Sequence, residues 1–229
     1  MIELEAFVQG QHAVYDKFRR LTIREEGTTP PKTVENRDGY LVIIQHPDEI
    51  IQRCANFSRK IAQVVPAMEY ERITVHTTLA VVGMQYRDPG LQQLDQSTMS
   101  LLQNALHSVA ANFSRVSIPY EGWLYNRDTT VAWGIAGNDF VQLVDLIHES
   151  LAKYNAVQFG KVQQPWGAHI TVSRFLEYTP PEQLADFFHV VENEPALPPS
   201  TPEAVCLGYV SVKEGKVGIG VMDQFLLKQ

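Results

Sequence analysis

Residues 73–83 read ITVHTTLAVVG, and residues 168–175 read AHITVSRF. Each stretch is apolar and β-branched, and each carries a histidine with a threonine two places later. The pairs are His76 with Thr78, and His169 with Thr171. Because residues i and i+2 of a strand point to the same face, each stretch predicts a strand that presents an imidazole and a hydroxyl side by side.

A third histidine fits the spacing but not the setting. His148 is followed by Ser150, and the apolar residues between Phe140 and Leu151 recur at helical spacing. On a helix, positions i and i+2 lie about 200° apart, so His148 and Ser150 diverge. We therefore leave this match out of the candidate site.

The two motifs occupy matching places in a repeated order of elements. Each half is expected to run strand, helix, strand with the motif, helix, strand. The first half comprises 40–45, 48–65, 72–82, 91–113 and 115–125, and the second comprises 129–137, 139–154, 168–175, 181–191 and 204–212, before a last strand at 218–226. Chance alternation in an α+β chain is the competing explanation. An internal duplication predicts two pseudo-symmetric lobes with one motif each.

The residues before the repeat form a separate prediction. Residues 1–38 are expected to be an N-terminal helical extension, with a helix from about 11 to 25, and residues 39–229 a single bilobal domain. His12 and Tyr15 lie in this extension. Packing of the helix on the core is the simpler role for it, and a cap over the cleft is the alternative.

Composition limits the class of protein. The chain has 229 residues, of which 45% are hydrophobic and 20% charged, as in ordinary globular proteins. Its net charge is −7, and no basic stripe is present. These features argue against binding of long duplex nucleic acid, whereas one or two local cations suffice for a small or terminal phosphate.

The sequence also suggests a compartment. No stretch reaches membrane-spanning length, and the acidic N-terminus has no signal-peptide pattern. Cys54 and Cys206 have neither metal-ligand nor redox spacing. We therefore expect a cytoplasmic protein without a membrane partner, a metal or another cofactor.

Two histidines on facing lobes suit the opening of a cyclic phosphodiester. One would take the proton of the attacking water and the other would protonate the leaving ring oxygen. Thr78 and Thr171 would hold the non-bridging oxygens as negative charge develops.

The flanking residues strengthen this interpretation. His76-Thr77-Thr78-Leu79 is followed by Gly83 after three further residues, and His169-Ile170-Thr171-Val172 is followed by Arg174. In these positions the chain resembles the two-histidine phosphoesterase superfamily, nearest its 2′-5′ RNA ligase-like branch. The resemblance covers about residues 40–226. The branch often has a proline where this chain has Ala168 and an aromatic where it has Val81.

The resemblance implies a fold, an activity and a set of residues. The fold is α+β and bilobal, with antiparallel sheets facing a central cleft and helices outside. The activity is metal-independent conversion of a cyclic phosphate to a phosphomonoester, in nucleotide or RNA processing. The residues carried over are His76, Thr78, His169 and Thr171.

Four further residues are candidates for substrate binding. Arg174 faces away from His169 in a regular strand, unless a bulge or the strand end brings it back to a phosphate. Trp166 and Tyr125 are candidates for stacking on a base, with core packing as the alternative. Tyr86 is a candidate at the rim of the cleft.

Three functions remain open at this stage. The first is hydrolysis of a nucleoside 2′,3′-cyclic phosphate or of the cyclic end of an RNA. The second is 2′-5′ joining of RNA ends, against which the acidic charge argues. The third is a nucleotide- or phosphate-binding module without turnover. A Ser-His-Asp hydrolase is disfavoured because no Gly-x-Ser-x-Gly sequence is present.

Overall fold

The computed structural model of the chain describes residues 2–86, 94–153 and 162–228. Short 3-10 turns lie at Lys32–Val34, Arg72–Thr74 and Pro181–Gln183. The helices and strands in these ranges are α1 (Leu4–Arg19), α2 (Ile23–Glu26), β1 (Arg37–Ile44), α3 (Asp48–Val64), β2 (Ala67–Glu69), β3 (Thr77–Tyr86), α4 (Gln96–Ala110), β4 (Tyr120–Tyr125), β5 (Thr129–Gly134), α5 (Asn138–Lys153), β6 (Ile170–Phe175), α7 (Ala185–Glu192), β7 (Ala204–Lys213) and β8 (Lys216–Leu226).

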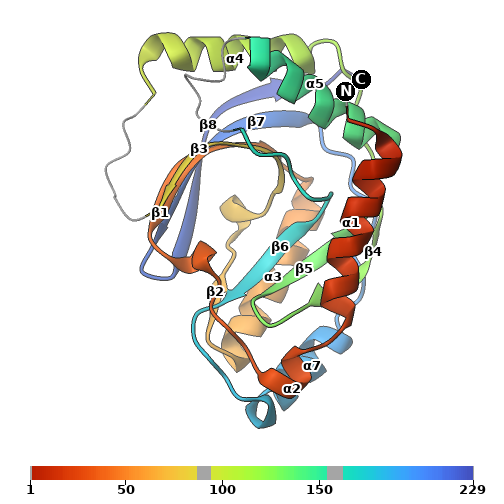
Figure 1. Cartoon of the computed structure of the whole chain (residues 1–229), viewed down its shortest axis with the longest axis vertical. Helices are drawn as coiled ribbons and strands as arrows, with labels where there is room; N and C mark the ends of the chain where they lie inside the picture. The colour runs from red at the N-terminus through yellow and green to blue at the C-terminus, as the bar shows by residue number, and fades with distance from the viewer. Residues whose placement is uncertain (1, 87–93, 154–161, 229) are drawn as a thin grey trace.

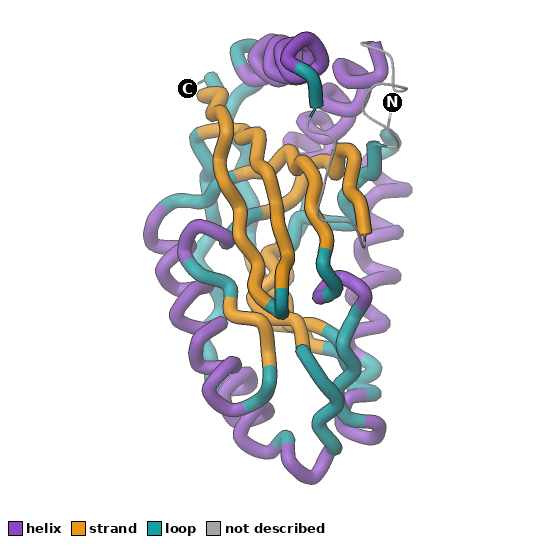
Figure 2. Tube along the Cα trace, turned by 90° about the vertical axis from the view of Figure 1, so that its left-hand side faces the viewer, coloured by secondary structure: helices purple, strands orange, loops and turns teal. Residues whose placement is uncertain are grey.

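Within the described residues, the strands form two four-stranded antiparallel sheets. The β1 sheet has the order β3-β1-β7-β8, and the β5 sheet has the order β2-β6-β5-β4. Helices lie outside the strands (Figures 1 and 2). The predicted α+β fold with two lobes is confirmed, and each lobe carries one motif strand, β3 or β6.

The lobes do not coincide with the two halves of the chain. β4 ends the first half but pairs with β5, whereas β7 and β8 end the second half but lie beside β1. A short turn joins β4 to β5, and short connections favour antiparallel pairing of neighbouring strands. Each half therefore contributes strands to both sheets.

The helices show the same exchange. α4 and α5 pack on the β1 sheet, and α3 and α7 pack on the β5 sheet (Figure 1). α5 buries Phe140, Leu143, Val144, Ile147 and Leu151, which recur at intervals of three and four and so form one face. Burial of each such side chain contributes about 1.5–3 kcal/mol. No helix within the described ranges is both long enough and apolar enough to span a membrane.

Several boundaries differ from the prediction. The strand expected from residue 72 begins at Thr77, because Thr74 donates both its N–H and its hydroxyl to the carbonyl of Glu71 and closes a 3-10 turn. The strand expected from 115 begins at Tyr120, and the short strand β2 was not predicted. Both motif histidines consequently stand immediately before their strands.

The N-terminal helix lies against the β5 sheet. α1 runs beside β4 (Figure 1). Tyr15 on this helix is fully buried, and its hydroxyl donates to the carbonyl of Gly134 over 2.8 Å. The segment that the sequence sets apart as an extension is thus packed on the core.

Candidate active site

The two motifs have matching local structures. From His76 to Val81 and from His169 to Arg174, residues one, three and six of each run are partly exposed, and the other three are buried. In both strands the pairing register slips at the residue after the motif threonine, which is Leu79 in β3 and Val172 in β6. A bulge at that point brings the sixth residue back to the face of the histidine and threonine.

Each histidine ring is held in the same way. Nδ1 of His76 lies 2.7 Å from the carbonyl oxygen of Thr74, and Nδ1 of His169 lies 3.2 Å from that of Gly167. A carbonyl oxygen only accepts, so Nδ1 carries the proton in both rings. The neutral ring then has its lone pair on Nε2. Both imidazoles are therefore set as bases at Nε2.

The electrostatic surroundings keep both rings neutral. The pKa of His76 is lowered to about 4, first by desolvation and then by the charges of Arg174 and Arg37, against the raising effect of its bond to Thr74. The pKa of His169 is lowered to about 3 by desolvation, and then by Arg174 and His76. A bound phosphate anion would offset these cationic charges and favour protonation of one ring.

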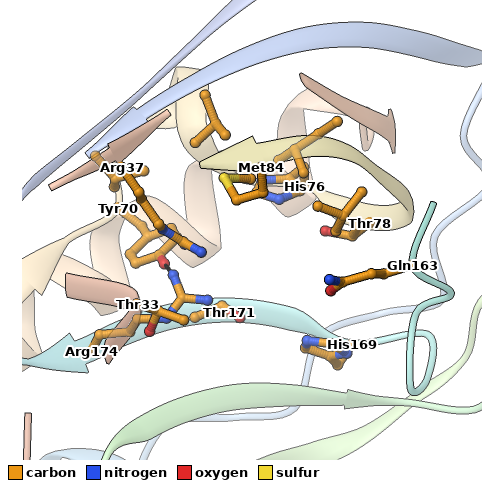
Figure 3. Close-up of a pocket in the computed structure, with 14 residues that line it drawn as sticks. Thr33, Arg37, Tyr70, His76, Thr78, Met84, Gln163, His169, Thr171 and Arg174 are labelled. Carbon is orange, nitrogen blue, oxygen red and sulfur yellow. Dashed lines mark hydrogen bonds between the residues drawn. The ribbon is translucent and has the colours of Figure 1, made fainter. Parts of the chain in front are cut away.

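A cavity of about 230 Å³ lies between the lobes, and all four motif residues line it. His76 and Thr78 face it from the β3 side, and His169 and Thr171 face it from β6 (Figure 3). The structure thus brings together the four residues that the sequence pairs only within each motif. Among the residues described, no three His, Cys, Asp or Glu side chains gather in a group that could hold a metal ion.

Arginine makes the cavity asymmetric. Arg174 lines it because the bulge at Val172 turns its side chain toward the cleft, and its guanidinium donates to the hydroxyl of Tyr70 (Figure 3). The matching position in the first motif is Val81. Arg37, at the start of β1, lines the same cavity. Arg174 thus occupies the alternative position that the sequence left open.

The other candidates have different surroundings. The ring of Trp166 stacks on that of His169, with centroids 3.6 Å apart and an interplanar angle of 16°. Tyr125 lies outside the cleft: it packs on Phe187, and its hydroxyl donates to Glu192, so the expectation of a stacking role is replaced by a packing role. Tyr86 ends β3, and its side chain lies outside the described part of the chain.

Sequence reasoning missed a buried polar chain behind the motifs. His46 is 3% exposed, with Nδ1 2.8 Å from the hydroxyl of Ser200 and Nε2 3.0 Å from that of Thr77. Thr77 in turn donates to the carbonyl of His169. Tyr70 and Arg37 were also missed. None of these residues carries a local signal, because the role of each depends on pairing between distant segments.

Comparison with known proteins locates the fold. No protein-family model and no curated protein matches the sequence. Protein TT0787 of Thermus thermophilus superposes with a TM-score of 0.55 at 16% identity, over 83% of this chain and 97% of that one. LigT of E. coli in complex with 3′-AMP gives 0.55 at 13% identity, over 84% and 99%.

A third similar structure is ATU0111 from Agrobacterium tumefaciens str. C58, a conserved protein of unknown function. It gives a TM-score of 0.59 at 14% identity, over 89% of this chain and 97% of that one. Such low identities establish likeness of fold. The predicted bilobal α+β fold is thus shared with these three solved structures.

Proposed function

We propose that this protein is a metal-independent phosphoesterase that hydrolyses a cyclic phosphodiester to a phosphomonoester. The substrate would be a nucleoside 2′,3′-cyclic phosphate or the cyclic end of an RNA. The observation that carries the proposal is the convergence of both motifs on one cavity, with two imidazoles tied at Nδ1 and an arginine beside them.

The reaction needs one base and one acid on opposite sides of phosphorus. Nε2 of one neutral histidine accepts a proton from water as the water oxygen bonds to phosphorus. The other histidine, protonated once the anionic substrate is bound, donates its Nε2 proton to the ring oxygen as that P–O bond breaks. One ring ends protonated and the other neutral, so the proton count balances.

The remaining groups stabilise charge. Thr78 and Thr171 would donate hydroxyl hydrogen bonds to the non-bridging oxygens, and the Arg174 guanidinium would supply a positive charge there. LigT of E. coli has been solved with 3′-AMP, with phosphate, with ATP and with NADP+. These complexes support a small phosphate-bearing ligand for the present chain.

The test is hydrolysis of a panel of 2′,3′-cyclic nucleotides with EDTA present. We expect turnover by the wild type and a loss of roughly 10²- to 10⁴-fold in kcat for His76→Ala and for His169→Ala, with folding retained. His189→Ala, at an exposed position of α7, is the matched control. Full activity in either motif variant would refute the mechanism. Nucleotide binding without turnover would favour a binding module.

A further inference from the structure

A second cavity, of about 260 Å³, adjoins the first, and Thr171 and Arg174 of β6 line both. It shares these two residues, together with His169 and Thr33, with the catalytic cavity. A molecule whose phosphate contacts the motif threonines could therefore extend into this second space without leaving the cleft.

The N-terminal segment builds one wall of the second cavity. Val14 and Phe18 come from α1, and Pro31 comes from the loop after α2. Trp166 completes an apolar surface and is held firmly, since Tyr15 meets its ring at 5.4 Å and Phe18 at 6.1 Å between centroids. A rigid apolar wall of this kind suits a flat, uncharged group.

The two cavities differ in charge. Arg37 and Arg174 line the catalytic cavity, and no Asp or Glu is among its described lining residues. The second cavity shares Arg174 but lacks Arg37 among its described lining residues, and it also has Asp128 on its wall. Burial raises the pKa of this carboxyl, while Asn126 and Arg174 lower it. A carboxylate accepts hydrogen bonds from N–H or O–H groups and repels a second phosphate.

Hydrogen bonds on both sides hold the backbone of Asp128 in place. The side-chain oxygen of Asn126 accepts the N–H groups of Asp128 and Thr129, each over 2.9 Å. The carbonyl of Asp128 accepts from the N–H of Phe175 over 3.1 Å, next to Arg174 on β6. Asp128, in the turn before β5, and Arg174, on β6, are thus neighbours, and both line the second cavity.

We infer that the second cavity is a nucleoside pocket, which receives the uncharged base and sugar of a substrate whose only phosphate is the cyclic one. Phe18 and Trp166 would pack against the base, and Asp128 would accept a hydrogen bond from one of its N–H groups. This inference rests on the proposed function and makes α1 part of the substrate site.

The test compares two substrates that differ in what would fill the pocket. Adenosine 2′,3′-cyclic phosphate carries a nucleoside, and glycerol 1,2-cyclic phosphate carries none. We expect Asp128→Asn and Phe18→Leu each to lower the ratio of their kcat/KM values by roughly tenfold. Phe7→Leu is the matched control, because Phe7 lies on the same helix but packs on Phe140.

A second readout tests the charge. Adenosine 3′-monophosphate should inhibit the wild type more strongly than adenosine 3′,5′-bisphosphate does. Asp128→Asn should reduce the difference between the two inhibition constants. An unchanged difference between the inhibition constants in Asp128→Asn, or equal losses of kcat/KM on both cyclic substrates, would refute the nucleoside pocket. Neither result would contradict the proposed hydrolase activity.

Failure of the hydrolase itself has a different signature. If the wild type cleaves neither substrate, calorimetry of adenosine 3′-monophosphate against inorganic phosphate tests the pocket alone. The nucleoside pocket would be supported if Phe18→Leu and Asp128→Asn lowered the affinity for the nucleotide and left the affinity for phosphate unchanged. Equal affinity for nucleotide and phosphate in the wild type would refute it.

Discussion

The hydroxyl of Thr77 donates to the backbone carbonyl of His169 across the junction of the lobes, with 3.0 Å between the oxygens. Since its only proton goes to that carbonyl, Thr77 must accept from Nε2 of His46, and Nδ1 of His46 must accept from Ser200. One hydrogen-bond chain therefore fixes a tautomer and links the two motifs.

Thr77→Val should break this link with little change in shape. It leaves the His169 carbonyl and the His46 N–H without their partner, which costs about 1–3 kcal/mol in the free energy of unfolding. Urea denaturation measures this loss, and kcat for a cyclic nucleotide should fall while KM changes less. Thr77→Ser keeps the hydroxyl and should restore both quantities. A serine variant as damaged as the valine variant would contradict the proposed link.

His46 should make the protein less stable in acid. Burial lowers its pKa to about 3, whereas the unfolded chain titrates near 6.5. The unfolded state therefore binds more protons between these values, and stability falls as the pH drops through this window. At pH 5 the loss from His46 is about 2 kcal/mol relative to pH 7.

The variant His46→Gln tests whether His46 causes this loss of stability at low pH. Its free energy of unfolding should depend less on pH between 7 and 5 than that of the wild type. His189→Gln, at an exposed position, serves as the control and should keep the wild-type slope. Parallel slopes for His46→Gln and the wild type would rule out His46 as the source.

α1 should contribute to the placement of His169. Gln11 is fully buried, and its side-chain oxygen accepts the N–H of Ala168 over 3.0 Å. Gln11→Leu leaves that N–H unpaired beside the histidine, so we expect kcat to fall roughly 10- to 100-fold through misplacement of the ring. Gln9→Leu is the matched control on the exposed side of the same helix. Equal kcat values for the two variants would show that α1 does not contribute to the placement of His169.

Arg174 should set both phosphate affinity and the pH profile. Its charge lowers the pKa of His76 and of His169. Arg174→Met removes that effect, so both pKa values rise and the acidic limb of kcat/KM moves to higher pH. Loss of a charged hydrogen bond to phosphate should also raise KM by roughly tenfold or more.

The control for Arg174→Met is Arg59→Met, since Arg59 forms an exposed ion pair with Glu69. Rate profiles between pH 4 and 8 measure the effect. If the pH profile of Arg174→Met overlays that of the wild type, Arg174 does not act on the two histidines.

The sequence predicted the parts of this molecule that have a local signal. The two histidine–threonine pairs and the alternation of strands and helices predicted an α+β fold with two lobes and four of the residues that line the cavity. The helical spacing around His148 was also sound: His148 lies in α5, and its ring contacts the carbonyl of Leu79 from the helix side.

The remaining features depend on pairing between distant segments. Strict alternation places Arg174 away from the cleft, and only the register slip at Val172 reverses this. The residue types of Leu79 and Val172 do not predict a bulge, because the pairing with the partner strand determines where a bulge forms. Tyr125 reads as a plausible stacking residue, yet α7 covers it after folding. His46 acquires its role only when β1 meets the start of β3.

The exchange of strands between the halves has a consequence for folding. A fragment that stops before β5 would hold β1 and β3 without β7 and β8, and β4 and β2 without their partners. The β5 sheet cannot form until β6 has been synthesised, and the β1 sheet cannot form until β7 and β8 have been synthesised. Contacts of such long sequence separation slow folding and favour one cooperative melting transition for both lobes. A ligand in the cleft would accordingly raise the melting temperature of the entire molecule.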